Sequence, residues 1–230
     1  MKICGLQKTT LLDFPGHVAA TIFTGGCNFR CPFCHNSLLV NSDKNSLDYS
    51  REDIIEFLEK RRKQLDGICI SGGEPLLHDE TFELVDAAKT LGYKVKLDTN
   101  GSFPEKLKRI VESKLIDYVA VDIKNSPGKY FKTCGSQQFE KVEESVKFLL
   151  GGKVDYEFRT TVTGNLHEVS DFIEIGRFIT GAKRYYLQKF INSGSILIGD
   201  PHDFEISDIK LAECLQSVRQ FISSAEIRGY

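Results

Sequence analysis

Apolar and polar positions alternate along this chain in two different rhythms. Six short apolar runs, rich in β-branched residues, resemble buried strands, and each precedes a stretch whose apolar positions recur at helical spacing. The runs cover residues 18–23, 68–70, 95–97, 118–123, 156–162 and 185–187. This regular succession of strand and helix predicts an α/β fold with a parallel sheet and right-handed crossovers.

Residues that begin or end helices fall where the alternation needs them. Ser50 is a favourable N-cap with Asp53 three residues further on, and Pro104 suits the first turn of a later helix. Gly92 follows the helical stretch after the second run, as expected just beyond a helix end. The last three helices are expected at residues 139–150, 169–179 and 206–222.

A barrel and a doubly wound open sheet are the two arrangements that such a pattern allows. No G-x-G-x-x-G motif follows the first run, so a dinucleotide-binding sheet has no positive support. Cysteines directly after the first strand suit a site at the carboxyl ends of barrel strands. Because no linker or low-complexity segment interrupts the chain, we predict a single domain over residues 1–230, an incomplete TIM-like (βα)6 barrel.

Composition narrows the classes of function. The 230 residues have a net charge of -2, and basic side chains are matched by acidic ones, which argues against a nucleic-acid partner. No apolar run approaches the length of a membrane span, and the sequence after Met1 does not resemble a signal peptide. Together with the odd number of cysteines, seven, these features predict a cytoplasmic protein with no membrane partner.

The triplet Cys27, Cys31 and Cys34 is the most informative chemical feature of the sequence. It follows the first strand and a glycine turn at residues 25–26. Three thiolates in a C-x-x-x-C-x-x-C pattern can hold three corners of a 4Fe-4S cluster and leave one iron without a protein ligand. The amino and carboxylate groups of S-adenosylmethionine (SAM) would complete that iron, so the motif predicts a generator of radicals.

A structural zinc site is the alternative interpretation, because His35 directly follows the triplet. Neighbouring residues in extended backbone point to opposite sides, so Cys34 and His35 are poorly placed to share one ion. The other four cysteines have no ligand spacing, and we expect them to be small hydrophobic residues. They are Cys4, Cys69, Cys134 and Cys214.

The segment Ser71-Gly72-Gly73-Glu74-Pro75 directly follows the second strand. Two glycines allow the backbone to approach a ligand closely, and the proline favours an extended conformation at Glu74. The Glu74 carboxylate could then accept from an ammonium group. An ordinary strand-to-helix turn is the alternative, but the cysteine triplet one strand earlier favours a ligand site.

With both motifs in this order, the chain resembles the radical SAM superfamily over nearly its whole length. The resemblance implies a partial barrel and reductive cleavage of SAM to a 5'-deoxyadenosyl radical that abstracts hydrogen. It implies that Cys27, Cys31 and Cys34 bind the cluster and that Phe33 lies beside the adenine. Residues 72–74, Gly72, Gly73 and Glu74, would hold the methionine amino group.

A narrower resemblance is to the activating proteins of glycyl-radical enzymes, notably those of pyruvate formate-lyase and the anaerobic ribonucleoside-triphosphate reductase. It rests on Asp-Phe-Pro-Gly at 13–16, Cys-His-Asn at 34–36, Asp-Thr-Asn-Gly at 98–101 and Asp-Ile-Lys at 122–124. By similarity, Asp98, Thr99 and Asp122 would surround the methionine carboxylate, with a monovalent cation and with Lys124 nearby. Two residues at later strand ends complete this expectation: Arg159 for the carboxylate and Gln188 for the ribose.

His35 and Asp13 are candidates for contact with the substrate. His35 either positions a partner peptide beside the cluster or packs under the loop, and both possibilities are open. Asp13, in the loop before the first run, has the same status. The remaining histidines, His17, His78, His167 and His202, are expected to be surface or capping residues.

The resemblance implies that the substrate is a glycine of a partner glycyl-radical enzyme, presented as a loop to an anaerobic enzyme. A flavodoxin or ferredoxin type protein would supply the electron. A small-molecule enzyme similar to 7-carboxy-7-deazaguanine synthase is the alternative, with a closed pocket for a pterin. A non-catalytic iron-sulfur module is a third class, although such a module would not need residues 72–74 or Asp122.

Overall fold

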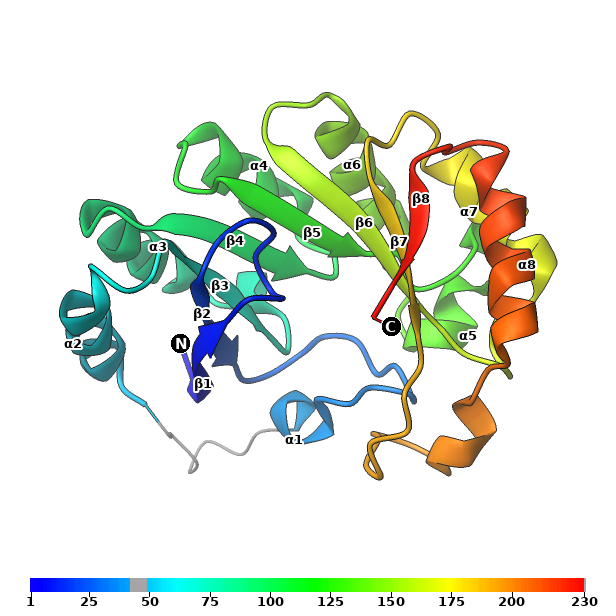
Figure 1. Cartoon of the computed structure of the whole chain (residues 1–230), viewed down its shortest axis with the longest axis horizontal. Helices are drawn as coiled ribbons and strands as arrows, with labels where there is room; N and C mark the ends of the chain where they lie inside the picture. Colours follow the sequence, from blue (N-terminus) through cyan, green and yellow to red (C-terminus); the bar gives the residue numbers. More distant parts are fainter. Residues whose placement is uncertain (42–48, 230) are drawn as a thin grey trace.

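A computed structural model describes residues 1–41 and 49–229 of the chain. Its centre is one eight-stranded sheet in which the strands follow each other in chain order (Figure 1). The strands are β1 (Ile3–Thr10), β2 (Ala19–Thr24), β3 (Gly67–Gly72), β4 (Lys94–Thr99), β5 (Tyr118–Asp122), β6 (Asp155–Val162), β7 (Tyr185–Lys189) and β8 (Ala225–Arg228).

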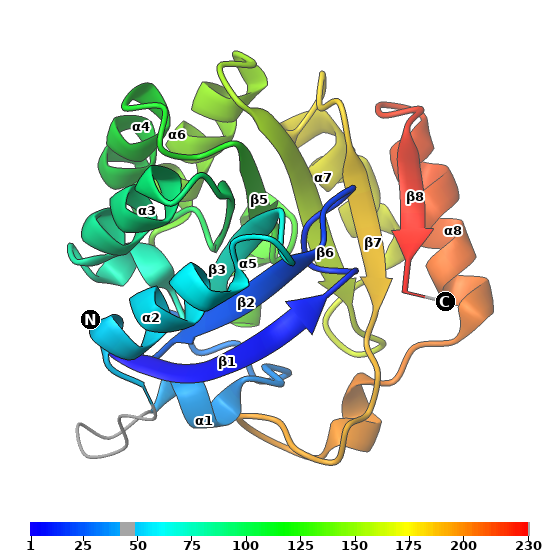
Figure 2. The same ribbon diagram turned by 60° about the vertical axis from the view of Figure 1, so that its left-hand side comes forward.

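The strands β2 to β8 are parallel, and β1 alone pairs antiparallel, along β2. Within the described residues β1 and β8 pair on one side only, so the barrel stays open between them (Figure 2). The expected α/β fold with a parallel, incomplete barrel of six strand–helix units is confirmed. Each strand from β2 to β7 is followed by helix before the next strand begins.

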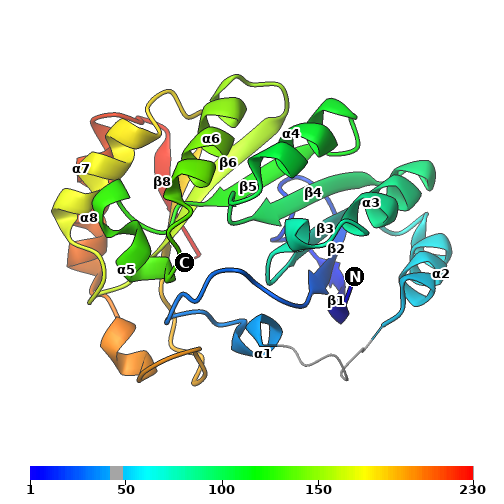
Figure 3. The same ribbon diagram turned by 180° about the vertical axis from the view of Figure 1, so that it is seen from behind.

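Helices cover the outer face of the curved sheet, and Figure 3 shows α3, α4, α6, α7 and α8 in front of it. The α-helices are α1 (Ser37–Val40), α2 (Arg51–Arg61), α3 (Thr81–Thr90), α4 (Pro104–Glu112), α5 (Tyr130–Cys134), α6 (Phe139–Leu150), α7 (Val169–Phe178) and α8 (Asp208–Arg219). Short 3-10 helices lie at Pro75–Leu77, Pro127–Lys129 and Pro201–Phe204. In the part of the chain that the structure describes, no helix is long and apolar enough to cross a membrane.

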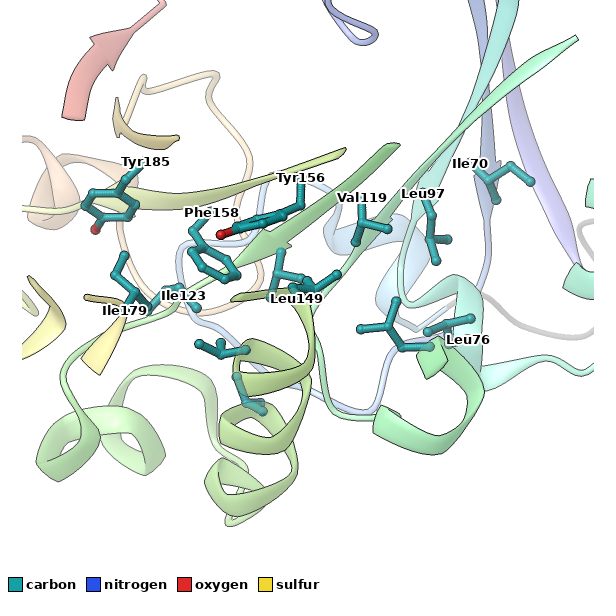
Figure 4. Packing of buried hydrophobic residues seen from close by; sticks show 14 of the residues in the cluster. Ile70, Leu76, Leu97, Val119, Ile123, Leu149, Tyr156, Phe158, Ile179 and Tyr185 are labelled. Carbon is teal, nitrogen blue, oxygen red and sulfur yellow. The ribbon is translucent and has the colours of Figure 1, made fainter. Parts of the chain in front are cut away.

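The hydrophobic core lies between the sheet and the helices. Side chains alternate across a strand, so every second residue of each strand points outward. Ile70, Leu97, Val119 and Phe158 do so and are fully buried in one cluster with Leu149 of α6 (Figure 4). The opposite alternation leaves polar and charged residues on the inner face of the barrel, where a site can form.

Local sequence signals placed most helix boundaries correctly. Ser50 caps α2 in a capping box with Asp53, and Pro104 is the first residue of α4. The sequence pattern missed β1 and β8. β1 carries Gln7, Lys8 and Thr9 exposed at the edge of the sheet, and β8 has only four residues, so neither contains an apolar run. Both strands owe their conformation to pairing with a neighbour.

Candidate functional site

The segment that carries the three cysteines leaves β2 at Thr24 and crosses the carboxyl ends of the strands. Backbone hydrogen bonds fix it at several points. Gly73 N donates to Thr24 O at 2.8 Å, and Glu74 N donates to Gly26 O at 2.8 Å. Further along, Arg30 N donates to the carbonyl of Cys134, also at 2.8 Å. The thiols are therefore positioned by the end of β3 and by α5.

Gly72 and Gly73 are required because the cysteine segment lies directly against them. Gly72 has φ +117°, and a Cβ at this residue would lie 2.4 Å from the backbone of Thr24. A Cβ at Gly73 would lie 2.0 Å from the carbonyl oxygen of Gly26. The sequence suggested that these glycines let backbone approach a ligand. In the structure they also let two backbone segments approach each other.

A cavity of about 270 Å³ opens at the carboxyl ends of the strands. Its wall combines the thiols with residues from the ends of β3 to β7. These are Cys27, Phe29, Cys31, Phe33, Cys34, His35, Asn36, Val40, Ser71, Gly72, Gly73, Asp98, Thr99, Asn100, Asp122, Lys124, Arg159, Thr161 and Gln188. Residues from six separate parts of the sequence thus meet at one site.

Burial makes the free thiols unfavourable as anions. It raises the pKa of Cys31 to about 12 and also raises the pKa of Cys27 and Cys34, while the nearby Lys124 ammonium lowers all three. Thiolates at this place therefore need further positive charge. The irons of a 4Fe-4S cluster would supply it, so the donor set fits such a cluster.

The zinc alternative gains no support from the geometry. The His35 ring instead stacks on Phe190, with 4.8 Å between centroids, and its Nε2 lies 2.7 Å from the carbonyl oxygen of Ile191. His35 therefore joins the cysteine segment to the segment that follows β7, while it still lines the cavity.

The structure places the Glu74 carboxylate behind the cavity wall, and its expected contact with an ammonium group stays a prediction. Glu74 is fully buried and does not line the cavity. Its oxygens accept from Thr99 Oγ1 at 2.7 Å, from Asn100 N at 2.7 Å and from Leu76 N at 3.0 Å. Burial raises the pKa of Glu74 to about 7, and the three donors oppose that shift. Glu74 therefore joins the ends of β3 and β4, and the backbone of residues 72–73 faces the cavity.

Asp98, Asp122 and Arg159 meet on the inner face of the barrel. Arg159 Nη1 lies 3.2 Å from Asp98 Oδ2, and Arg159 Nη2 lies 2.9 Å from Asp122 Oδ1. Burial alone would raise the pKa of both carboxyl groups, but Arg159, with Lys96 and Lys124, lowers the pKa of each below its ordinary value. Both carboxylates are ionised and already paired.

The other expected SAM-binding residues also reach the cavity wall. Lys124 lies there with its Nζ 3.1 Å from Asp122 Oδ2. Phe33 is 5% exposed and contacts Phe204, and Gln188 comes from β7. Thr99 lines the wall as well, but its hydroxyl points to Glu74, so it offers the cavity backbone rather than its side chain.

Asp13 does not line this cavity, and its contact with the substrate stays a prediction. Its Oδ2 accepts from Thr21 Oγ1 at 2.5 Å inside the barrel. The neighbouring Phe14 packs on Ala19 and Tyr118 and lines a second cavity, together with residues that precede or begin β4 to β7. Figure 1 shows the β1–β2 loop and α1 at opposite ends of the barrel. Asp13 therefore belongs to the amino-terminal end.

Sequence reasoning missed two residues that support the site. His167 is fully buried rather than at the surface, and its Nε2 lies 2.9 Å from the carbonyl oxygen of Lys124. His78 Nε2 lies 2.7 Å from the carbonyl oxygen of Gly25, just before the cysteines. A lone histidine carries no local pattern, so only the fold reveals these contacts.

Comparison with known proteins decides the family. The model of the Radical SAM superfamily matches residues 21–179, a span that includes the cysteine triplet and both strand-end aspartates. The chain belongs to the Radical SAM superfamily. Membership implies a 4Fe-4S cluster and SAM as cofactors and reductive cleavage of SAM as the reaction.

Two relatives and one solved structure illustrate the range of similarity. A Methanocaldococcus jannaschii protein, named provisionally as a glycyl-radical enzyme activating enzyme, is 34% identical over 82% of this chain and 79% of its own. The 7-carboxy-7-deazaguanine synthase of Halobacterium salinarum is 36% identical over 40% of this chain and 36% of its own. Streptococcus suis SuiB bound to SAM is 18% identical, with a TM-score of 0.70 over 90% of this chain and 49% of that protein. The last comparison concerns the fold alone.

Proposed function

We propose that this chain activates a glycyl-radical enzyme by abstracting a hydrogen atom from a glycine in a loop of that partner. The observation that carries the proposal is the similarity to the named activating enzyme over most of both chains. The sequence resemblance at residues 34–36, 98–101 and 122–124 points the same way, and all three segments contribute to the cavity wall.

Each part of the cavity has a role in this proposal. Cys27, Cys31 and Cys34 hold the cluster. The backbone of residues 72–73 receives the methionine ammonium, and Arg159 with Lys124 receives the carboxylate. When bound and reduced, the cluster supplies the electron that cleaves SAM to methionine and a 5'-deoxyadenosyl radical.

Phe33 and Gln188 are the proposed contacts of the adenine and ribose. Their positions suit this division because Phe33 precedes the last cysteine and Gln188 lies at the end of β7. The protein contributes orientation and shielding from water, because no residue of the wall has to act as an acid or a base in hydrogen-atom transfer.

The cavity favours a substrate that stays mostly outside it. Its wall consists largely of residues already assigned to the cluster and SAM, and its remaining members include Ser71, Asn100 and Thr161. A loop that inserts one glycine through the mouth would need little additional volume.

A small-molecule enzyme similar to 7-carboxy-7-deazaguanine synthase is the second candidate, because one such enzyme matches 40% of this chain. That relative shares a shorter part of the chain than the activating enzyme does. A cytoplasmic, anaerobic setting and a flavodoxin or ferredoxin type reductant complete the first proposal. The anaerobic setting would protect an oxygen-sensitive partner, and the reductant would supply the electron for its activation.

Electron paramagnetic resonance with a partner protein tests the proposal. The reduced enzyme, SAM and a large protein with a carboxyl-terminal glycine loop encoded beside this chain should give a glycine-centred radical. 5'-Deoxyadenosine should form in about equal amount, because each abstraction consumes one SAM. Cys34→Ala should give neither product, whereas Cys69→Ala should give both, since Cys69 is buried within β3 away from the cavity.

Turnover of a pterin without any partner protein would contradict the activating function and support the second candidate. Stoichiometric zinc without iron in anaerobically prepared protein would contradict both enzymes. Isotope transfer gives an independent readout, because deuterium from a labelled partner glycine should appear in 5'-deoxyadenosine.

A further inference from the structure

Five charged side chains form an alternating row across β4, β5 and β6. Lys96 Nζ lies 2.5 Å from Asp98 Oδ1, and Asp98 Oδ2 lies 3.2 Å from Arg159 Nη1. On its other side, Arg159 lies 2.9 Å from Asp122 Oδ1, and Asp122 Oδ2 lies 3.1 Å from Lys124 Nζ. Each carboxylate thus has a different cation at each of its oxygens.

The row is built into the barrel. Asp122 and Arg159 are direct partners in the pairing of β5 with β6, and Lys96 and Asp98 occupy alternate positions of β4. The side chains of Lys96 and Arg159 are only 1% and 13% exposed. In such surroundings water screens charge weakly, so a charge without a partner in this row would be energetically costly.

The row contains one cation more than it has carboxylates: Lys96, Arg159 and Lys124 face Asp98 and Asp122. Further anions lie close to the row: Glu157 is joined to Arg228 by two hydrogen bonds of 2.7 Å, and Asp13 lies inside the barrel, bonded to Thr21. At the cavity end, Arg159 and Lys124 line the wall together with Asp98 and Asp122. A ligand carboxylate would pair with the remaining N–H donors of these two cations.

The expected monovalent cation does not fit this arrangement. Its place would be between Asp98 and Asp122, around the methionine carboxylate, and the Arg159 guanidinium already joins these two aspartates. An added cation would have to displace the guanidinium or lie beside the three cations that already pair with these aspartates. Neither is favourable in a poorly solvated site.

We propose that Arg159 replaces the monovalent cation in this chain, so that Arg159 and Lys124 bind the SAM carboxylate without added sodium or potassium. A guanidinium has five N–H donors and an ammonium has three, so both retain donors after pairing with the aspartates. The inference depends on SAM binding at the cavity and is independent of the proposed protein substrate.

Isothermal titration of SAM into the anaerobic holoenzyme tests this inference without an activity readout. The titration is repeated at constant ionic strength in potassium, sodium, lithium and tetramethylammonium chloride. The wild-type dissociation constant should change by less than about twofold among these salts, because no step of binding takes up a small cation. A change of about tenfold or more between potassium and tetramethylammonium would overturn the proposal.

In the variant Arg159→Met, SAM affinity should depend on the cation of the salt, as it does not in the wild type. Removing the guanidinium leaves Asp98 and Asp122 with one cation each instead of two, so affinity in tetramethylammonium should fall by roughly tenfold to a hundredfold. Potassium at about 100 mM should restore part of it, since a small cation can enter between two carboxylates. Arg184→Met, at the amino-terminal end of β7, is the matched control and should behave as the wild type.

Each remaining outcome also bears on the proposal. Equal loss of affinity by Arg159→Met in all four salts would contradict the replacement of a cation. Should that variant fail to retain its iron, the wild-type salt series decides alone. A wild type that binds no SAM in any salt would overturn the inference. SAM binding without a glycine radical would contradict only the proposed function.

Discussion

The two loops at either end of β2 look equally promising in the sequence and behave differently in the structure. The loop before β2 carries Asp13 and Phe14, and the loop after it carries the three cysteines. Phe14 is 2% exposed and closes the amino-terminal end of the barrel against Ala19 and Tyr118. The cysteine segment borders an open cavity at the other end.

Strand geometry explains the separation. A strand rises about 3.3 Å per residue, so the six residues of β2 hold the two loops roughly 20 Å apart. In a parallel barrel all strands point the same way, and ligands gather at the carboxyl ends. Residues close in sequence on opposite sides of a strand therefore belong to different ends, and only the later loop can serve the cofactors.

Gly73→Ala should have the largest effect, because it acts where the cysteine segment lies against β3. The added Cβ would lie 2.0 Å from the carbonyl oxygen of Gly26, and backbone on both sides prevents an easy shift. We expect the Cys27 segment to move and the iron content after anaerobic reconstitution to fall by about tenfold or more. Iron and sulfide analysis with the visible absorption spectrum would measure this loss.

Gly16→Ala is the control at the other end of β2. Gly16 has φ +77°, so alanine is strained there by about 1 kcal/mol, but no atom lies within 4 Å of its Cβ. The cluster should form normally in this variant. Equal iron in both alanine variants would show that the contact between Gly73 and Gly26 does not position the cysteines.

The same two ends show how far sequence reasoning reaches. The order of strands and helices followed from periodicity, and the family resemblance brought Asp98, Asp122 and Arg159 together as candidate residues of one site. The direction of the Glu74 side chain could not be predicted from the sequence in this way. Its carboxylate turns toward donors from the next strand, and no local pattern encodes a partner that lies 25 residues away. The parts that depend on tertiary contacts had to come from the structure.

His167→Gln should have an intermediate effect that depends on pH. Nδ1 of His167 accepts from the N–H of Thr163, so the ring is neutral and its Nε2–H donates to the carbonyl of Lys124. Burial lowers the pKa of His167 to about 4, below the ordinary 6.5. Between these values the unfolded chain binds a proton that the folded protein does not, so stability falls as the pH falls.

Urea denaturation of the apoprotein at pH 7 and pH 4.5 measures that contribution without interference from acid loss of the cluster. From pH 7 to pH 4.5 the wild type should lose about 2 to 3 kcal/mol more than His167→Gln, at about 1.4 kcal/mol per pH unit. His202→Gln, at a side chain that is 75% exposed, is the control for the loss of one imidazole. Identical slopes for wild type and His167→Gln would mean that His167 is not held neutral.

Asp13→Asn should have the smallest effect and distinguishes the two ends most directly. Asparagine can still accept from Thr21 Oγ1, so we expect a loss of stability of only about 1 kcal/mol. Because Asp13 lies at the amino-terminal end, SAM affinity and the yield of glycine radical should stay within about twofold of wild type. His35→Ala removes both the stacking on Phe190 and the contact with Ile191 at the cavity, and the radical yield should fall roughly tenfold. If Asp13→Asn lowered the radical yield as much as His35→Ala at unchanged stability, the partner would have to reach both ends of the barrel. The assignment of the functional site to the loop after β2 alone would then be wrong.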